Sequence, residues 1–269
     1  MYGPPPALTP EGIKLYRPED FEGMRRAGRV AAEVLDRIGP HVAPGVSTEE
    51  LDARIEAEVD ALGAISATIG YRGYRHASCI SVNHVVCHGI PGPKKLRDGD
   101  ILNIDVTVVV DGWYGDTSRM FAAGRPKRAA ERLIEVTHEA LMRGIAAVRP
   151  GATFGDIGAA IQDYVEAERC SVVRDFCGHG LGREFHEAPN VLHFGRRGAG
   201  AVLRPGMFFT IEPMVNLGRA ETKTLADGWT AVTRDKSLSA QFEHSVGVTE
   251  EGAEIFTLSP AGRFFPTFA

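Results

Sequence analysis

Apolar residues recur every three or four positions along two early stretches of the chain, the spacing of one face of an α-helix. The first stretch begins at Pro18 and ends near Gly39-Pro40, and its apolar positions are Phe21, Met24, Ala27, Ala31, Val34 and Ile38. The second opens with the capping-box pattern Ser47-Thr48-Glu49-Glu50 and carries Leu51, Ile55, Val59 and Leu62. The pattern therefore predicts two amphipathic helices, over residues 18–39 and 47–62.

Strand-like segments follow, in which β-branched and other apolar residues are concentrated. They cover residues 78–82, 101–110 and 113–121, and Asp111-Gly112 lies between the last two. An Asp-Gly pair between two such runs is a strong signal for a two-residue hairpin turn. The sequence therefore predicts a long antiparallel hairpin after the two helices.

The same order of elements recurs in the second half of the chain. A helical pattern over residues 127–148 is followed by Pro150-Gly151, by a second helical pattern over 154–168, and by strand-like runs near Val172, at 207–211 and at 241–248. Pro44-Gly45 holds the corresponding place about 106 residues earlier. This order predicts a duplicated α-α-β-β unit, with halves of about 18–125 and 126–260 in a single domain that spans 18–269. The alternative is that Pro-Gly marks two unrelated helix ends.

Residues 1–17 precede this pattern and are rich in proline. We expect them to form an N-terminal tail without a core of its own, because they carry no helical or strand periodicity.

Composition narrows the class of protein without naming a chemistry. The 269 residues are 43% hydrophobic and 24% charged, with four cysteines and a formal net charge of -5. There is no apolar run of about 18 residues, and the first residues lack the basic and apolar parts of a secretory signal. Mild acidity argues against a protein that binds phosphate backbones, and four cysteines favour a reducing compartment. We therefore expect a cytoplasmic globular protein with no membrane partner and no specific nucleic-acid partner.

Two aspartates lie in the predicted hairpin, where an unpaired charge is costly if the strands are buried. If Asp111-Gly112 forms the turn, Thr107 lies opposite Asp116, and Asp105 lies diagonally from Asp116 on the same face. The two carboxylates would then be close enough to share a metal ion. A shift of the register by one residue would separate them.

Two glutamates repeat this feature in the second half, because Glu212 ends the run 207–211 and Glu243 lies within the run 241–248. Two charges about 4 Å apart repel by roughly 4 kcal/mol at an effective dielectric near 20, so four acids on one sheet require protonation or bound cations. Two divalent cations would match the four charges. His179, flanked by glycines, is the expected nitrogen ligand, and this donor set suits Mn, Fe(II), Co or Zn.

Other interpretations of these residues stay open at this point. A single Asp in a strand is more often hydrogen-bonded structure than a ligand, and a Gly-His-Gly turn is more often a loop. Cys87-His88 and Cys177-x-His179 could belong to a structural zinc site, but without CxxC pairs they are poor evidence for one. A cysteine nucleophile with a histidine base would leave the strand carboxylates unexplained. The sequence identifies no partner for three other histidines, His41, His138 and His193.

Short motifs spread along the chain resemble bacterial type I methionine aminopeptidases. In chain order they are Cys87-His88-Gly89-Ile90-Pro91, Asn103-Ile104-Asp105-Val106-Thr107, Gly115-Asp116-Thr117-Ser118, Cys177-Gly178-His179-Gly180-Leu181-Gly182, Phe185-His186-Glu187, Thr210-Ile211-Glu212-Pro213-Met214 and Ala240-Gln241-Phe242-Glu243-His244. The resemblance covers roughly Pro18 to Leu258. It implies the pita-bread fold, an α+β fold in which two pseudo-symmetric halves surround a curved antiparallel sheet. It also implies an enzyme that removes the initiator methionine from nascent chains when the second residue is small.

The resemblance implies a role for each charged site residue. Asp105 would chelate one metal ion, Asp116 and Glu243 would bridge both, and His179 and Glu212 would hold the other. Glu212 would also move a proton from the attacking water to the leaving amine. His88 is similar to the family histidine beside the N-terminus of the substrate, and His186 to the one near the scissile carbonyl.

A methionine pocket is also implied by the resemblance, with a lining that is aromatic and polarizable and suits a thioether. Its residues would be Tyr71, Tyr74, Cys79, Phe185 and Trp229. Thr68 stands where some relatives have cysteine, and the loop 71–76 lacks the Pro-Lys pair common after the second aromatic residue. We do not expect this loop to change the chemistry.

Two other functions are compatible with the same fold. A proline-specific exopeptidase is one, although such relatives commonly carry a large extra N-terminal domain. A non-catalytic binding protein is the other, although such members typically lose ligands that are all present here. For the aminopeptidase, the expected partners are the N-terminal methionine of nascent polypeptides and, transiently, the ribosome, and the expected state is a monomer.

Overall fold

Two successive sets of helices and strands make up the part of the chain that the computed structural model describes, residues 5–266. The first set consists of β1 (Ala7–Leu8), β2 (Lys14–Leu15), α1 (Asp20–Ile38), η1 (Gly39–His41), α2 (Thr48–Ala61), β3 (Ile65–Ser66), η2 (Tyr71–Gly73), β4 (Cys79–Val82), β5 (Val85–Cys87), β6 (Asp100–Val110) and β7 (Trp113–Ala123). The second consists of α3 (Arg128–Ala146), α4 (Phe154–Ala167), β8 (Ser171–Val172), β9 (Gly178–Gly180), β10 (Glu187–Val191), β11 (Phe208–Ile211), β12 (Met214–Asn216), β13 (Thr222–Thr224), β14 (Ala231–Thr233), β15 (Ser239–Gln241), β16 (Glu243–Val248) and β17 (Ala253–Ile255). The long helices begin and end within two residues of the predicted positions.

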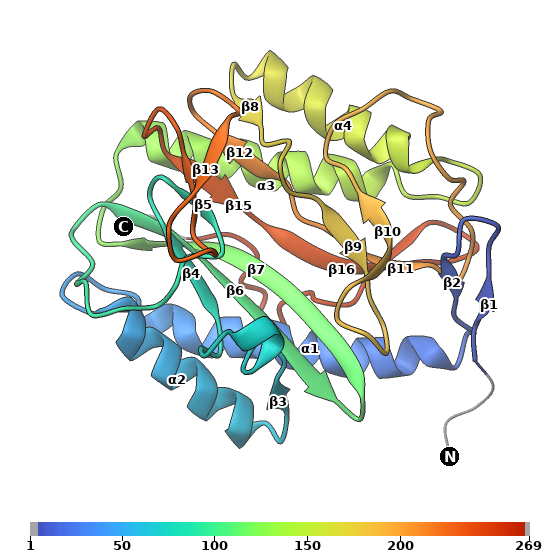
Figure 1. Cartoon of the computed structure of the whole chain (residues 1–269), viewed down its shortest axis with the longest axis horizontal. Helices are drawn as coiled ribbons and strands as arrows, with labels where there is room; N and C mark the ends of the chain where they lie inside the picture. Colours follow the sequence, from blue (N-terminus) through green and yellow to red (C-terminus); the bar gives the residue numbers. More distant parts are fainter. Residues whose placement is uncertain (1–4, 267–269) are drawn as a thin grey trace.

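One antiparallel sheet contains strands from both halves of the chain. Its order is β10-β9-β11-β16-β7-β6-β3, with β4 paired to β6 and β17 paired to β16. Helix α1 lies along β6 and β7 and α2 packs against α1 and β3, both blue in Figure 1, whereas α3 and α4, green to yellow, lie along strands of the second half. In this sheet the halves meet where β16 pairs with β7, and β5 of the first half also pairs with β14 of the second. This is the α+β pita-bread architecture that the family resemblance implies.

Each half has its own apolar core between its helices and its strands. Leu51 of α2 and Ile104 of β6 are fully buried in the first core, and Leu133 of α3 and Phe209 of β11 in the second. A third, aromatic cluster joins the halves near Trp113. In each half the apolar side chains of the strands face the helices, and the polar side chains on the opposite face of the shared sheet line the space between the halves.

The two halves match most closely where their second helices begin. Ser47 caps α2 together with Glu50, and Thr153 caps α4 in the same reciprocal way. The glycines of the two Pro-Gly pairs, Gly45 and Gly151, have φ values of 89° and 85°, which other residues rarely adopt. The repeated Pro-Gly signal therefore marks two equivalent helix starts, as expected for a duplicated unit.

The β6–β7 hairpin has the register that the sequence predicts. Asp111 and Gly112 both have positive φ, 51° and 74°, as a type I′ turn requires. Val110 therefore pairs with Trp113, and Thr107 with Asp116. Since register decides which face each side chain occupies, this turn determines where the aspartates of the hairpin point.

The N-terminal segment differs from the tail that the sequence predicts. β1 and β2 pair with each other, and Ile13 and Tyr16 are buried. The Tyr16 ring stacks on Phe208 with centroids 4.6 Å apart, and its hydroxyl donates a hydrogen bond to Glu187 at 3.0 Å. The part of the Pro-rich stretch before residue 5 lies outside the described residues. Residues 7–16 thus pack against the domain, and strands of two residues carry too little pattern for the sequence to reveal them.

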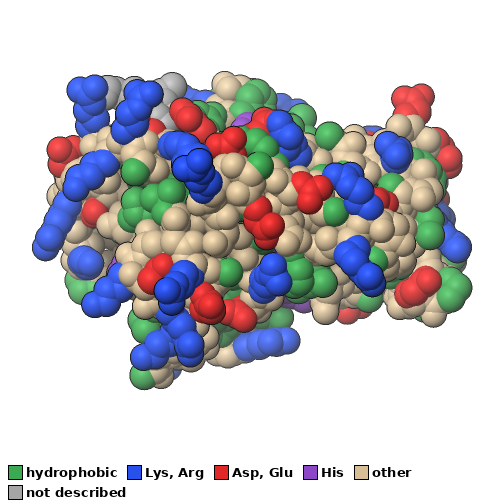
Figure 2. Space-filling view, turned by 90° about the horizontal axis from the view of Figure 1, so that it is seen from above, with side chains coloured by type: hydrophobic (Ala, Val, Ile, Leu, Met, Phe, Trp, Pro, Cys, Tyr) green, Lys and Arg blue, Asp and Glu red, His purple; other side chains and the backbone are tan. Residues whose placement is uncertain are grey.

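Charged side chains of both signs are interspersed over the face shown in Figure 2. This distribution agrees with the small net charge of -5. Within residues 5–266, none of the helices has the length and apolar content needed to cross a membrane.

Candidate metal centre and active site

A row of paired residues across three strands brings predicted ligands from both halves together. Glu243 of β16 pairs with Ser118 of β7, and Ser118 pairs with Asp105 of β6. Asp116 lies two residues before Ser118 and therefore faces the same side of the sheet. Together with Glu212, which directly follows β11, these carboxylates line one cavity of about 660 Å³. The structure thus gathers all four predicted acids in one place.

His179 of β9 faces this group of carboxylates. Its Nδ1 lies 3.0 Å from the carbonyl oxygen of Gly180, which can only accept, so Nδ1 carries a proton. Its Nε2 lies 3.4 Å from Oδ2 of Asp116 and 3.8 Å from Oε1 of Glu212. One ligand atom each from Asp116, His179 and Glu243 lie within 4.8 Å of one another. This arrangement leaves Nε2 as the atom that can ligate an ion between the acids.

Burial and mutual repulsion shift the pKa values of the cluster. Burial raises the pKa of Asp105 well above its usual value, and the charge of Asp116 raises it further. Burial likewise raises the pKa of Glu243 well above the usual range and that of Glu212 to about 7. Burial lowers the pKa of His179, but its hydrogen bond to Asp116 and the charge of Glu212 outweigh that effect and raise it to about 9. The metal-free cluster therefore retains protons. A divalent cation would replace these protons, and the oxygen-rich donor set suits such an ion.

Neutral side chains orient the carboxylates. The Thr107 hydroxyl donates to Oδ1 of Asp116 at 2.8 Å, and the Thr210 hydroxyl donates to Oε1 of Glu212 at 2.8 Å. The Gln241 amide donates to the other oxygen of Glu212 at 3.2 Å. No motif in the sequence predicts these three roles, although the spacing of the residues along their strands could have indicated them. In a strand, a residue two positions from a ligand faces the same side, and all three residues stand in that relation to a predicted ligand.

His193 has a partner that the sequence analysis did not identify. Its ring is fully buried, and its Nε2 accepts a hydrogen bond of 3.0 Å from the backbone N–H of Glu212. Burial lowers the pKa of His193 to about 3, so the ring is neutral. Its Nδ1 has no hydrogen-bond partner among the described residues. His193 is thus a core histidine that holds the backbone of a predicted ligand, and no local sequence pattern signals this contact.

Aromatic side chains form the wall of the cavity away from the carboxylates. The rings of Tyr71 and Phe185 are 4.8 Å apart, and those of Tyr74 and Trp229 are 4.9 Å apart. Cys79, which pairs with Asp105 across β4 and β6, lies between this wall and the acids. All five residues of the predicted methionine pocket therefore line the same cavity as the predicted ligands.

The two predicted catalytic histidines also line the cavity. The ring of His186 lies 4.1 Å from that of His179, and burial together with the charge of His179 lowers the pKa of His186 to about 4. His88 packs edge-on against Phe176 at 5.5 Å, and burial lowers its pKa. His186 is therefore a neutral imidazole at neutral pH, able to donate one hydrogen bond.

The cysteines do not support either of the alternative chemistries. Burial raises the pKa of the Cys79 and Cys87 thiols, and that of Cys177, so each stays protonated and unreactive at neutral pH. Among the described residues, the group whose ligand atoms lie close enough together to hold a metal ion consists of two carboxylates and one histidine and contains no cysteine. His244, beside Glu243 in the sequence, turns away to bond the Thr257 hydroxyl through Nδ1 at 2.8 Å.

A histidine buried among carboxylates in a pita-bread fold defines a class of metallopeptidase. The profile of metallopeptidase family M24 matches residues 22–250, and the chain belongs to this family. It is 57% identical over 249 residues to methionine aminopeptidase from Escherichia coli K12, a match that covers 91% of this chain and 94% of the relative. The predicted resemblance to bacterial methionine aminopeptidases is confirmed.

Solved structures agree with this assignment. The crystal structure of methionine aminopeptidase from Rickettsia prowazekii matches with a TM-score of 0.91 at 55% identity, over 91% of this chain and 100% of that chain. Prolidase from Pyrococcus furiosus matches with a TM-score of 0.72 at 22% identity, and the match covers 65% of its chain. The likeness to prolidase concerns the fold alone.

Proposed function

We propose that the protein is a metal-dependent aminopeptidase that removes the initiator methionine from nascent polypeptides when the second residue is small. This proposal rests on one observation: the carboxylate–histidine cluster and the aromatic pocket line the same cavity. The similarity to enzymes named methionine aminopeptidase supports the same substrate.

The cluster would hold two divalent cations of the Co, Mn, Fe(II) or Zn type. Asp105 would chelate one ion, His179 and Glu212 the other, and Asp116 and Glu243 would be shared by both. Four carboxylates balance the charge of two such ions, which relieves the repulsion that otherwise keeps protons on the acids. When bound, the ions would polarise the scissile carbonyl and lower the pKa of a water molecule that attacks it.

The residues of the chain bind the substrate and move its protons. The methionine side chain would enter the pocket of Tyr71, Tyr74, Cys79, Phe185 and Trp229, where a thioether finds polarizable aromatic neighbours. This contact would direct the first peptide bond toward the carboxylates, with the substrate N-terminus beside His88. The neutral ring of His186 would donate a hydrogen bond to the carbonyl oxygen as negative charge develops there.

Glu212 is suited to carry the proton between water and leaving group. It lines the cavity beside His179, with its Oε1 3.8 Å from Nε2 of that ring, and a general base must lie within hydrogen-bond reach of the proton that it takes. Thr210 and Gln241 each bond one of its oxygens and so hold the carboxylate in place. Glu212 would take a proton from the attacking water and deliver it to the amine that leaves.

A peptide assay tests this proposal against both alternatives. The protein should release methionine from Met-Ala-Ser much faster than from Met-Leu-Ser, and it should leave Ala-Pro dipeptides intact. Equal cleavage of both methionine peptides would remove the preference for a small second residue. Preferential cleavage of Xaa-Pro bonds would establish a proline-specific exopeptidase, and no cleavage of any peptide after metal supplementation would favour a binding protein.

The cellular setting follows from the substrate. We propose a cytoplasmic monomer that meets nascent chains at the ribosome transiently. The cysteines of the chain are free thiols, as is usual in a reducing compartment. Sedimentation equilibrium at micromolar concentration should give a mass near 29.0 kDa, and the protein should co-sediment with ribosomes weakly and in a salt-dependent way.

A further inference from the structure

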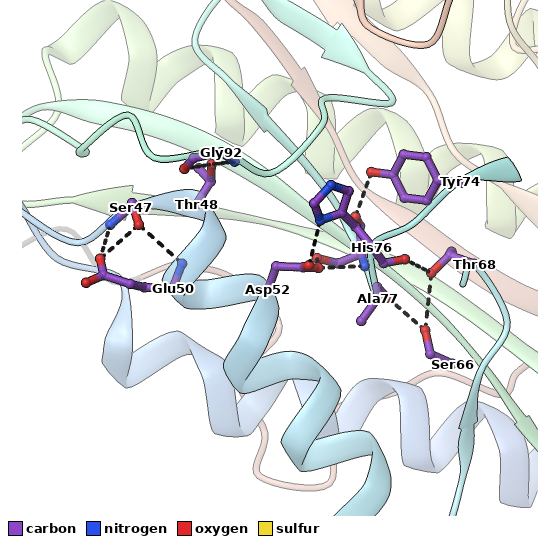
Figure 3. Close-up of polar contacts among 11 residues, drawn as sticks. Ser47, Thr48, Glu50, Asp52, Ser66, Thr68, Tyr74, His76, Ala77 and Gly92 are labelled. Atoms are coloured by element: carbon purple, nitrogen blue, oxygen red, sulfur yellow. Dashed lines mark hydrogen bonds and ion pairs between the residues drawn. The ribbon is translucent and has the colours of Figure 1, made fainter. Parts of the chain in front are cut away.

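Part of the aromatic wall belongs to one segment that side-chain hydrogen bonds attach to a helix (Figure 3). We call residues 67–78, between β3 and β4, the pocket loop. Thr68, Tyr71, Arg72 and Tyr74 of this loop line the cavity. Near its tip, Gly70, Arg72 and Gly73 have φ values of 87°, 48° and 84°, so the chain turns sharply there. The position of the wall therefore depends on what holds the two legs of the loop.

Asp52 of α2 is the centre of this attachment. Its Oδ1 accepts hydrogen bonds from the backbone N–H and the hydroxyl of Ser78, at 2.9 and 2.7 Å. Its Oδ2 lies 3.0 Å from Nδ1 of His76, and since an ionised carboxylate only accepts, Nδ1–H donates. A carboxylate that is 6% exposed is costly unless it is satisfied, and these three donors satisfy it. We call Asp52, His76 and Ser78 the Asp52 latch.

The helix that carries Asp52 is itself firmly held, as Figure 3 shows. Ser47 and Glu50 form its capping box. The Thr48 hydroxyl donates to the carbonyl of Gly92 at 3.1 Å and accepts from its N–H at 2.9 Å. The Asp52 latch therefore ties the pocket loop to a fixed element and not to another loop.

Tyr74 connects the latch to the interior of the pocket. Its hydroxyl donates to the carbonyl oxygen of Ser78 at 2.9 Å, and its ring lies 4.9 Å from Trp229. Ser78 is followed by Cys79, the pocket residue that pairs with Asp105. A shift of Ser78 would consequently move the ring of Tyr74 and the thiol of Cys79 relative to the carboxylates.

The other leg of the pocket loop, and the end of β3 before it, donate hydrogen bonds to the backbone carbonyls of residues 76 and 77. The Thr68 hydroxyl donates to the carbonyl oxygen of His76 at 2.7 Å, and the Ser66 hydroxyl donates to that of Ala77 at 3.2 Å. The two hydroxyls are 3.2 Å apart. His76 thus lies between Asp52 on one side and the cavity-lining Thr68 on the other.

We propose that His76 and Asp52 are positioning residues that determine how selectively the pocket accepts methionine. This inference rests on the proposed function, because it assumes that the cavity receives the side chain of the first residue. Neither residue belongs to the carboxylate cluster or lines the cavity. Loss of the latch therefore weakens binding of the first side chain and leaves the chemical step largely intact, so KM rises and kcat changes little.

The test compares three variants by steady-state release of the first residue from Met-Ala-Ser and norleucine-Ala-Ser. H76A removes the donor to Asp52. H76N retains an N–H near the position of Nδ1, and R75A changes the exposed neighbour on the same loop. Since the His76 side chain is 30% exposed, we expect H76A to raise KM for Met-Ala-Ser roughly three- to tenfold, the effect of losing one hydrogen bond to a charged group from a donor that is partly accessible to water. H76N and R75A should stay within twofold of wild type, and H76A should lose part of the preference for methionine over norleucine.

Hydrogen exchange of residues 67–78 supplies a readout that does not depend on catalysis. Exchange in this segment should rise in H76A and remain at the wild-type level in H76N and R75A. An unchanged KM and an unchanged methionine preference in H76A overturn the proposal, even if its melting temperature falls. A tenfold loss of kcat at constant KM also overturns it. If wild type releases no first residue from either peptide, the proposed function fails, and the selectivity role fails with it. If wild type cleaves normally and H76A behaves like wild type, only the role of the Asp52 latch in selectivity is refuted.

Discussion

Removing bound metal should make the stability of this protein fall as the pH rises from 7 to 8.5. The reason is His179, whose Nε2 faces Asp116 and Glu212 at 3.4 and 3.8 Å. Without a cation, a proton on Nε2 satisfies these carboxylates, and the pKa of the ring is raised to about 9. The folded metal-free protein therefore holds a proton that the unfolded chain releases near pH 6.5.

The sign and size of the effect follow from this difference. A group whose pKa is higher in the folded state stabilises the protein below its unfolded pKa, and that stabilisation is lost as the pH rises through the folded pKa. With values of about 9 and 6.5, His179 loses about 2 kcal/mol of stabilisation between pH 7 and 8.5. Glu212, with a pKa raised to about 7, adds a smaller loss in the same direction.

Denaturant unfolding of chelator-treated protein measures this directly, with His179→Gln as the matched control. Buried thiols and the other histidines titrate in both proteins, so the difference between them reports His179 and the acids whose pKa its charge lowers. The stability of wild type relative to the variant should fall by about 2 kcal/mol over this range. Saturation with Mn should abolish the fall, since ligation requires the lone pair of Nε2. A difference that is constant, or that grows with pH, would refute the electrostatic account of the cluster.

Four further substitutions test other parts of the structure. Glu212→Gln at saturating metal should lower kcat for Met-Ala-Ser by about 10²–10⁴-fold with little change in KM, because it removes the proton carrier. His186→Ala should cost about 2.7–4 kcal/mol of transition-state stabilisation if the ring acts as an oxyanion donor, and an unchanged kcat would exclude it from the mechanism. His193→Leu leaves the buried N–H of Glu212 without its acceptor and should lower the free energy of unfolding by about 1–3 kcal/mol. Arg119→Leu strips the buried Asp36 of its 2.8 Å ion pair and should cost about 3–5 kcal/mol in the same measurement, whereas a loss below 1 kcal/mol would mean that water replaces the arginine.

Local signals in the sequence were sufficient wherever one short segment determines the geometry. Asp111-Gly112 permits few turn types, so the register of β6 and β7, and the approach of Asp105 to Asp116, could be worked out from the residues themselves. The capping box at Ser47 determined the start of α2 in the same way.

Local signals do not predict contacts between segments that are far apart in the sequence. His179 and Glu212 meet because β9 pairs with β11, a long-range pairing that no local pattern specifies. Residue type alone had grouped them as ligands, and the family resemblance had assigned them to the same ion. Asp52 and His76 are separated by the rest of α2, a short strand and most of a loop. Periodicity places Asp52 next to Leu51 on α2 but does not tell which donors will satisfy its carboxylate. Buried polar networks of this kind are determined by tertiary packing, and sequence pattern reveals them only when their members share a strand face.

Metal titration of the chelator-treated protein, with methionine release from Met-Ala-Ser followed at each addition, tests the central claim most directly. The account predicts that the metal-free protein is inactive and that activity returns with added Mn, Co or Fe(II), reaching its plateau by two equivalents. A Glu243→Ala variant should fail to recover in the same titration. Undiminished methionine release after complete removal of metal would contradict the account.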